Sequence, residues 1–161
     1  MPFTTADLCD KHSGEEYFQI AEPILKNFGG NAVFSGQIST LKVFKDNVLI
    51  RKALEEKVND RILVVDGGGS QRCALLGGDL ATIAFNNGWQ GIVIYGCVRD
   101  SVELAQIPIG IRALRTHPLK SHKKGMGDRD VLITFGGINF KKDHFLYADR
   151  DGIIVSQTKL S

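Results

Sequence analysis

Apolar residues recur in short runs along the chain, and the middle third has the clearest order. Residues 61–66 and 91–95 form continuous apolar runs, the pattern of strands that are buried on both faces. Between them, the spacing predicts a helix over 80–87 that ends at Gly88. The succession of strand, glycine-rich loop, helix and strand predicts a βαβ unit, so part of the sheet is expected to be parallel.

The flanking thirds carry weaker patterns. Thr4 is expected to cap a short N-terminal helix, and further helices are predicted over 21–27 and 48–57. Short strands separated by turn residues are predicted over 32–34, 36–44, 73–76, 109–114, 131–135, 138–140, 144–148 and 153–155. These elements predict a layered, mixed α/β fold with a β-rich C-terminal part. No linker divides the chain, so we expect a single domain over residues 1–161.

Composition and charge narrow the classes of partner. Of the 161 residues, 43% are apolar and 24% charged, and the formal net charge is +2, values that are ordinary for a globular protein. A nucleic-acid binder usually shows a stripe of Lys and Arg. The nearest feature here is the basic run from Lys120 to Lys124, which is either a solvated loop or a binding patch, and charge runs are usually solvated. We therefore expect no direct nucleic-acid partner.

Cysteine usage and the N-terminal segment indicate a reducing compartment. Cys9, Cys73 and Cys97 are widely spaced and form no CxxC pair, so free thiols are expected. The N-terminal segment is polar, unlike a signal peptide, and no apolar run approaches the roughly 18 residues that span a bilayer. The sequence predicts a cytoplasmic protein with no membrane partner.

Three segments that follow predicted strands or open a predicted helix carry unusual groups. Asp66 precedes a triple glycine, Arg99 and Asp100 come shortly after Gly96, and residues 77–79 precede the helix predicted over 80–87. Ligands of α/β sheets bind in the crevice beyond the carboxyl ends of the strands. These segments are therefore the candidates for a functional site.

The backbone at this helix start is one candidate binding element, formed by Gly77, Gly78, Asp79 and Leu80. A helix N-terminus offers unpaired N–H groups and a partial positive charge, and glycine lets a ligand approach the backbone closely. The segment can therefore hold a carboxylate or a phosphate. The same residues also fit a plain turn in which Asp79 caps the helix.

Arg99 and Asp100 form the stronger candidate pair. A guanidinium group binds a carboxylate through two parallel hydrogen bonds. A neighbouring carboxylate can hold Mg²⁺, which needs only one or two protein carboxylates and keeps several waters. The alternative interpretation is a surface ion pair or a cap at the end of the strand.

Other residues give little support for a different chemistry. The triple glycine 67–69 matches neither GxGxxG nor GxxxxGK[ST]. Methyl transfer from a nucleotide-like cofactor finds no support, because the candidate glycine loop lacks an acidic ribose-binding partner. Cys97 has no histidine near it in sequence, so a thiol nucleophile is not expected. The histidines lack metal-ligand spacing and are interpreted as ordinary residues: His12, His117, His122 and His144.

At these residues the chain resembles the RraA-like family, which contains the regulator of ribonuclease activity A and 4-hydroxy-4-methyl-2-oxoglutarate aldolases. The resemblance covers nearly the whole chain and is carried by segments 6–10, 27–30, 34–38, 64–70, 91–96, 144–149 and 152–154. It implies a swivelling-domain-like fold with β/β/α layers in a single domain. It also implies a homotrimer with sites between subunits.

The aldolase members share a pattern of Gly, twenty residues, Arg-Asp, two residues, and Asp or Glu. Here the pattern is Gly78, Arg99, Asp100 and Glu103. By this resemblance Asp100 helps to hold a divalent cation, Mg²⁺ or Mn²⁺, partly through waters. Arg99 binds the substrate carboxylate and the enolate oxygen, and the backbone of residues 77–80 binds the same pyruvoyl end. Members that act only as regulators tend to lack the acidic residue after the arginine.

The resemblance thus implies a carbon–carbon lyase acting on a small 2-oxo acid, with oxaloacetate decarboxylation as a side activity, because both reactions give a pyruvate enolate. A cation and Arg99 both stabilise that negative charge. Glu103 and Asp66 are expected to support the groups that touch metal or substrate. The alternative function is a protein inhibitor that binds an RNA-degrading endonuclease without catalysis. Longer aldolase members carry extra C-terminal residues that help to complete a neighbour's site, whereas this sequence stops at Ser161.

Overall fold

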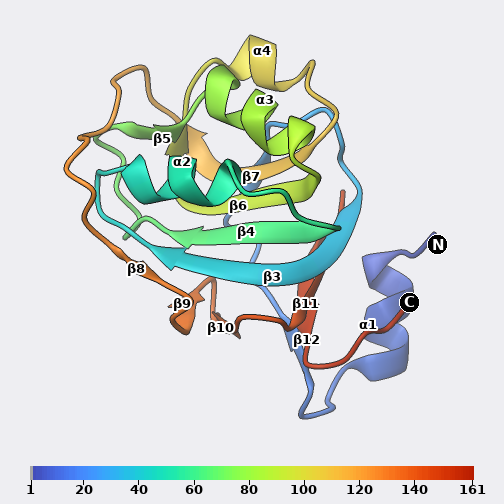
Figure 1. Ribbon diagram of the computed structural model, residues 1–161. Helices are drawn as coiled ribbons and strands as arrows, with labels where there is room; N and C mark the ends of the chain where they lie inside the picture. The colour runs from blue at the N-terminus through green and yellow to red at the C-terminus, as the bar shows by residue number, and fades with distance from the viewer. Residues whose placement is uncertain (1) are drawn as a thin grey trace.

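A mixed sheet organises the protein, whose computed structural model describes residues 2–161. Its strand order is β1-β12-β11-β3-β4-β6-β7-β2, with β5 paired to β6 and β8 paired to β3 (Figure 1). The strands of this sheet are β1 Phe18–Ile20, β2 Lys26–Asn27, β3 Phe34–Lys42, β4 Arg61–Asp66, β5 Ala74–Leu76, β6 Trp89–Val98, β7 Gly110–Thr116, β8 Asp128–Arg129, β11 Phe145–Asp149 and β12 Gly152–Ser156.

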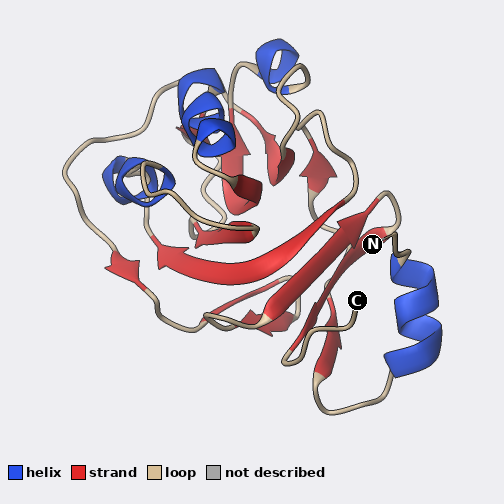
Figure 2. Cartoon of the chain, turned by 45° about the vertical axis from the view of Figure 1, so that its right-hand side comes forward, coloured by secondary structure: helices blue, strands red, loops and turns tan. Residues whose placement is uncertain are grey.

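The centre of the sheet is parallel, as the βαβ pattern predicts. Strands β3, β4, β6 and β7 pair in parallel in that order. The connections between them carry α2 Val48–Leu54, α3 Gly78–Asn86 and α4 Ser101–Leu104. Figure 2 shows these three helices on one face of the sheet, while α1 Thr5–His12 lies apart from them beside the antiparallel strands. The layered mixed α/β fold expected from the sequence is confirmed.

Strand β4 shows why the central strands are continuously apolar. Leu63 and Val65 belong to the core under the helices, whereas Ile62 and Val64 belong to the core on the opposite face. All four side chains are buried. A strand covered on both faces needs apolar residues at every position, because neither face meets water.

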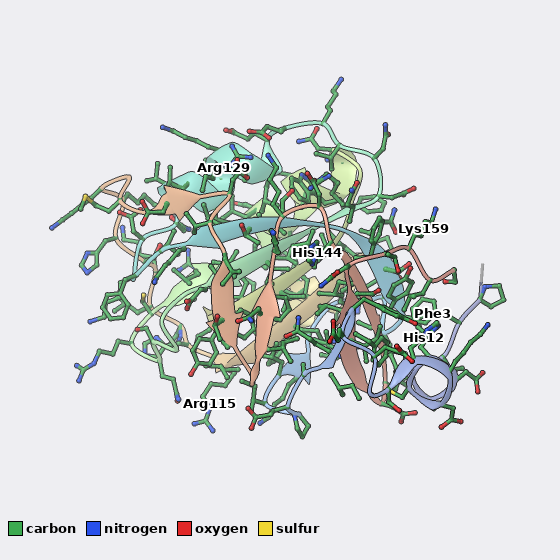
Figure 3. All side chains as sticks on the ribbon, turned by 90° about the horizontal axis from the view of Figure 1, so that it is seen from below. Phe3, His12, Arg115, Arg129, His144 and Lys159 are labelled. Atoms are coloured by element: carbon green, nitrogen blue, oxygen red, sulfur yellow. The ribbon has the colours of Figure 1, made fainter. Side chains whose placement is uncertain are left out.

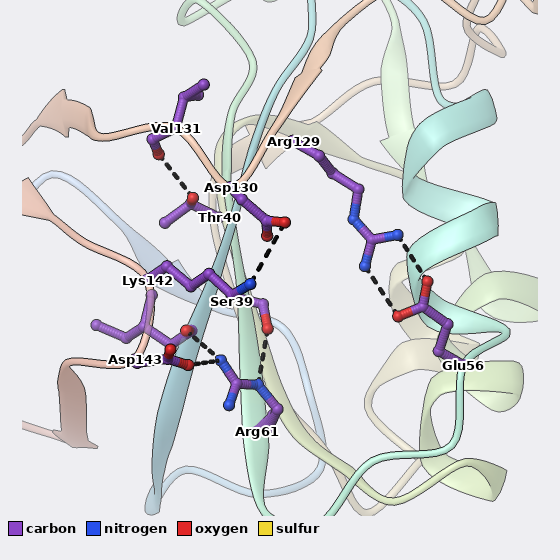
Figure 4. A network of polar contacts seen from close by, with 10 residues as sticks. Ser39, Thr40, Glu56, Arg61, Arg129, Asp130, Val131, Lys142 and Asp143 are labelled. Carbon is purple, nitrogen blue, oxygen red and sulfur yellow. Dashed lines mark hydrogen bonds and ion pairs between the residues drawn. The ribbon is translucent and has the colours of Figure 1, made fainter.

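The second face of the sheet is covered by strands from the C-terminal third. A small separate sheet pairs β9 Ile133–Phe135 with β10 Ile138–Phe140. Figure 4 shows polar contacts around β3. Arg61 on β4 donates to Ser39 on β3 and pairs at 2.8 Å with Asp143, in the loop after β10. Arg129 on β8 forms a two-bond pair with Glu56, which follows α2.

Helix α1 begins as its sequence predicts. The Thr4 side chain accepts a hydrogen bond from the Asp7 N–H, and the backbone N–H and hydroxyl of Thr5 both donate to the buried Asp149 carboxylate. Burial alone would raise the pKa of the Asp149 carboxyl, but the Thr5 bonds and backbone N–H groups outweigh it and hold the pKa below its usual value. These bonds attach α1 to the end of β11.

Two sequence-based expectations about elements are wrong. The helix predicted over 21–27 is extended chain that ends in β2, because Pro23 disfavours helical backbone at the residue before it. The backbone here bonds to β7 instead, with the Phe28 N–H donating to the Ile111 carbonyl. The strands predicted separately over 32–34 and 36–44 are the single strand β3.

The predicted helix over 48–57 is shorter than expected and ends at Leu54. Three short elements have no counterpart in the prediction: α4, β1 and β8. Each has two to four residues, too few for a periodic pattern to form. In the part of the chain that the structure describes, no helix is both long and apolar enough to cross a membrane.

Candidate functional site

The strongest candidate site lies where β6 ends and the chain turns toward α4. Arg99 continues the edge of the sheet, its N–H donating to the Leu76 carbonyl at 2.9 Å. Asp100 then adopts a left-handed conformation, with φ of 60°, and precedes the first turn of α4. A non-glycine residue in this conformation carries backbone strain, which must be offset by surrounding contacts.

One of those contacts joins Asp100 to the start of α3. Its Oδ2 accepts a hydrogen bond from the Gly78 N–H at 2.9 Å. A Cβ atom on Gly77 would lie 2.6 Å from the same oxygen, so only glycine leaves room for the carboxylate. Gly77, the N-cap residue of α3, makes no side-chain cap hydrogen bond in the described structure. Asp100 accepts the Gly78 N–H, and no side chain among residues 2–161 accepts the N–H groups of Asp79 and Leu80, which remain available at this helix end.

These groups line one cavity of about 200 Å³. Of the residues singled out from the sequence, it contains Gly77, Asp79, Leu80, Arg99 and Asp100; Gly78 is buried directly behind it. The structure therefore brings together a helix N-terminus, a guanidinium group and a carboxylate that are about twenty residues apart in the chain.

Arg99 is half-buried and has no carboxylate partner within 4.0 Å among residues 2–161. Its Nη1 donates only a long hydrogen bond, 3.4 Å, to the Pro118 carbonyl. The alternative interpretation of a surface ion pair between Arg99 and Asp100 is therefore wrong. The guanidinium keeps most of its donors free for a ligand.

Sequence reasoning missed a second wall of the cavity. This wall is formed by Asn47, Arg51, Lys120, Ser121 and Lys123. The basic run was visible in the sequence, but a solvated loop was the favoured interpretation. Backbone bonds hold this run beside the sheet: the Ala74 N–H donates to the Leu119 carbonyl. Only this long-range pairing places it next to Arg99.

Asp66 does not lie in this cavity, although it was expected to support the site. Its Oδ1 accepts a hydrogen bond from the Gly68 N–H at 2.8 Å. It lines a separate cavity of about 540 Å³ together with Phe44 and Met126. Glu103 is exposed, and its carboxyl lies where a Cβ atom on Gly78 would be.

The donor set around Asp100 suits a hard divalent cation that keeps most of its water. Within residues 2–161, no three His, Cys, Asp or Glu side chains are grouped as a closed metal site would require. Asp100 Oδ2 is held by the Gly78 N–H, and the exposed carboxylate leaves Oδ1 available. One carboxylate with water and substrate oxygens is a usual arrangement for Mg²⁺.

No histidine or cysteine is among the residues that line this cavity. Figure 3 shows His12 on helix α1 at the edge of the molecule and His144 nearer its centre. Burial raises the pKa of the Cys97 thiol, which is fully buried. The thiol is therefore protonated near neutral pH and is a poor nucleophile.

Comparison with known sequences assigns this constellation to a family. A profile of the RraA-like family described as Aldolase/RraA matches residues 5–155. The chain belongs to the Aldolase/RraA family. A relative from Methylococcus capsulatus, named "Putative 4-hydroxy-4-methyl-2-oxoglutarate aldolase", is 63% identical over 99% of both chains. A relative of the same name from Laribacter hongkongensis is 54% identical, again over 99% of both chains.

Solved structures of the Aldolase/RraA family share the fold described above. The RNA-processing inhibitor RraA from Thermus thermophilis superposes with a TM-score of 0.95 at 44% identity, covering 100% of this chain and 96% of that one. A structure from Geobacillus kaustophilus, titled as an S-adenosylmethionine:2-dimethylmenaquinone methyltransferase, has a TM-score of 0.94 at 47% identity, with coverage of 98% and 97%. These sequence relatives and solved structures thus carry three different functional names, and the site must discriminate among them.

Proposed function

We propose that this protein is a divalent-metal-dependent lyase that cleaves 4-hydroxy-4-methyl-2-oxoglutarate into two molecules of pyruvate. Oxaloacetate decarboxylation is proposed as a side activity. The observation that carries the proposal is the single cavity shared by Arg99, Asp100 and the N-terminus of α3. The names of the relatives that are 63% and 54% identical support the same reaction.

The chemistry requires negative charge to be stabilised at one oxygen. Breaking the C3–C4 bond moves its electron pair onto the C2 carbonyl oxygen, which gives a pyruvate enolate. The 4-hydroxyl loses its proton, and C4 becomes the carbonyl carbon of the second pyruvate. Protonation at C3 completes the first. Groups that bind the enolate oxygen more tightly than the ketone oxygen accelerate this step.

Each polar group of the cavity is proposed to have its own role in this reaction. The first-turn N–H groups of α3 bind the C1 carboxylate, as helix N-termini bind anions. The Arg99 guanidinium donates to the C2 oxygen as charge develops on it. Asp100 is proposed to hold Mg²⁺ or Mn²⁺, which when bound supplies a Lewis acid at the same oxygen. Its bond from the Gly78 N–H fixes the carboxylate relative to the helix end.

A second candidate function is inhibition of an RNA-degrading endonuclease through protein contact. It is favoured by the TM-score of 0.95 with the RNA-processing inhibitor RraA. Methyl transfer is less well supported, because the candidate glycine loop lacks the acidic ribose-binding partner that a nucleotide-like cofactor requires. Lyase activity and endonuclease binding can coexist, because one uses a cavity and the other uses a surface.

Further parts of the proposal rest on the family resemblance. We propose a homotrimer in which neighbouring subunits complete the sites, a single domain over residues 1–161, and a cytoplasmic location. Sedimentation analysis tests the assembly: a trimer is expected at about three times the 17.7 kDa chain mass. A monomeric species at micromolar concentration would contradict the proposed trimer and would leave the proposed lyase reaction unaffected.

The experiment that tests the lyase proposal measures pyruvate release by the purified protein. Release from 4-hydroxy-4-methyl-2-oxoglutarate and from oxaloacetate is expected with Mg²⁺ or Mn²⁺ and is expected to stop on chelation. Arg99→Met is expected to lower kcat/KM by about 100- to 1000-fold, the usual effect of removing a donor to a developing oxyanion. Arg115→Met is the matched control, because Arg115 is an exposed arginine on β7 that does not line the cavity (Figure 3). Equal activity of both variants, or an inert wild type that slows an endonuclease, would refute the lyase proposal.

A further inference from the structure

The cavity in front of Arg99 has a second polar wall that the reaction at the pyruvoyl end does not use. Ser121 lies in this wall and is only 5% exposed. Its Oγ is buried and has no hydrogen-bond partner among residues 2–161. A buried hydroxyl without a protein partner costs free energy, so binding of a ligand that accepts its hydrogen bond is favoured.

The charges around Ser121 indicate the sign of that ligand. Four basic residues line the cavity, namely Arg51, Arg99, Lys120 and Lys123, against two acidic residues, Asp79 and Asp100. Lys120 and Lys123 have no carboxylate partner within 4.0 Å in residues 2–161, and Lys123 instead donates to Asn47 Oδ1 at 3.0 Å. Arg51 has only a distant ion pair, 3.8 Å, with Glu55. The unbalanced positive charge favours an anionic ligand.

A single carboxylate does not account for this wall. The proposed binding of the pyruvoyl end already uses Arg99, Asp100 and the N-terminus of α3. Ser121 and the two lysines come from the segment after β7, whereas the proposed pyruvoyl site uses the start of α3 and the residues that follow β6. A ligand that satisfies both walls therefore carries two anionic groups separated by a short carbon chain.

The segment around Ser121 is fixed before any ligand binds. The His122 N–H donates to the Lys45 carbonyl, and the Asn47 N–H donates to the His122 carbonyl. Lys120 forms a bridge beside Ala74 on the other side of Ser121. These bonds hold the backbone on both sides of Ser121 in place, so little backbone entropy is lost when a ligand oxygen bonds to its hydroxyl.

We propose that Ser121, Lys120 and Lys123 bind the distal carboxylate of a dicarboxylic 2-oxo acid and select it over monocarboxylic analogues. This inference rests on the proposed function, since it takes the pyruvoyl end to lie at Arg99 and Asp100. It assigns a specificity role to residues outside the Gly, Arg-Asp and Glu pattern. The Ser121 hydroxyl donates to a carboxylate oxygen, and the two ammonium groups offset its charge.

The test compares two ligands that differ only at the distal end and that lack the 4-hydroxyl needed for cleavage. 2-Oxoglutarate carries the second carboxylate, and 2-oxopentanoate has a methyl group in its place. Isothermal titration in the presence of Mg²⁺ gives the ratio of the two Kd values. The wild-type protein is expected to prefer 2-oxoglutarate.

Ser121→Ala is expected to lower this preference about tenfold, the effect of a lost hydrogen bond to a charged group. Lys120→Met is expected to lower it about threefold, since Lys120 is exposed.

Control variants separate this proposal from the proposed function. Lys124→Met removes the same charge from a neighbouring lysine that does not line this cavity, and the preference is expected to stay unchanged. Arg99→Met is expected to weaken both ligands equally. If the wild type binds both ligands equally, or if Ser121→Ala weakens both to the same extent, the distal subsite is refuted while the lyase proposal stands. If the wild type binds neither ligand, the lyase proposal fails as well.

Discussion

Two strand ends in this protein look alike in sequence and differ in what their carboxylates face. Asp66 ends β4 and precedes a triple glycine; Asp100 follows β6 and also lies near glycines. Asp66 turns back on its own loop and accepts the Gly68 N–H. Asp100 reaches across to another element and accepts the Gly78 N–H at the start of α3.

This difference separates a carboxylate that stabilises its own turn from the one that we propose to be functional. A hydrogen bond two residues along the chain stabilises a turn, as Asp side chains commonly do. A bond to a distant helix start places the carboxylate beside unpaired N–H groups and the unpaired Arg99 guanidinium. Lysines line both neighbouring cavities, but the one beside Asp66 also has the large apolar side chains Phe44 and Met126, whereas arginines line only the other.

The largest expected effect on activity comes from comparing one substitution at each strand end. Asp100→Asn keeps an acceptor for the Gly78 N–H and tolerates the left-handed backbone, but it removes the charge that holds a cation. We expect kcat/KM for pyruvate release to fall by about 1000-fold or more. Asp66→Asn, the matched control, is expected to stay within about threefold of wild type, because the asparagine oxygen can still accept the Gly68 N–H. Similar losses of kcat/KM in both variants would contradict the proposed functional difference between Asp100 and Asp66.

Alanine substitutions at the glycines near the two strand ends should lower catalytic activity at one end and folding stability at the other. A Cβ on Gly77 would meet Asp100 Oδ2 at 2.6 Å, so Gly77→Ala is expected to lower kcat/KM about 100-fold with little change in unfolding free energy. A Cβ on Gly67 would meet Leu75 Cδ1 at 2.6 Å and the Tyr95 carbonyl oxygen at 2.8 Å. Gly67→Ala is therefore expected to lower the unfolding free energy by about 2 kcal/mol through overpacking.

Urea unfolding and pyruvate release, measured on both glycine variants, check this division. Activity per folded molecule should survive in Gly67→Ala. A Gly77→Ala protein that unfolds early yet keeps its activity would reverse the assignment of the two strand ends.

The smallest predicted effect concerns pH and the cavity beside Asp66. Asp46 is buried there, and burial alone would raise the pKa of its carboxyl. Backbone N–H donors, including Val48, Lys124 and Met126, outweigh burial and hold that pKa below its usual value. The stabilisation is therefore complete above the unfolded pKa of about 3.9 and is lost as the pH falls through the lower, folded pKa.

Asp46→Asn is expected to cost about 1–2 kcal/mol at pH 7, because an amide has one acceptor oxygen where the carboxylate uses two. Urea unfolding at pH 7 and pH 3 measures the cost, which should shrink at pH 3. A cost that is the same at both pH values would mean that the Asp46 charge does not stabilise this loop.

The strongest sequence predictions concern residues whose environment is local or uniformly apolar. Strand β4 spans the predicted residues 61–66, since four consecutive apolar side chains suit only a strand buried on both faces. The start of α1 follows from the Thr4 cap. The segment 21–27 was misassigned because its apolar spacing imitates a helix, while its actual partner, β7, lies more than eighty residues further along.

Some residues of the candidate site could likewise be predicted from the sequence, and others could not. The pattern of Gly78, Arg99, Asp100 and Glu103 can be found in the sequence, because a family resemblance marks residues wherever they lie. In the sequence, Ser121 and its neighbouring lysines were visible only as part of the basic run from Lys120 to Lys124. Their role depends on the pairing of residues 119–120 with Ala74, which no local pattern encodes.

The sequence by itself determined the parallel centre of the sheet, the family and the residue types available for chemistry, because apolar periodicity and motif spacing are properties of the chain. Only the tertiary structure decided which carboxylate faces the arginine, which faces its own loop, and which lysines close the cavity. The position of Asp100 and of the lysines depends on contacts between residues 22 to 76 positions apart, and hydrogen bonds at that range form only once the sheet has assembled.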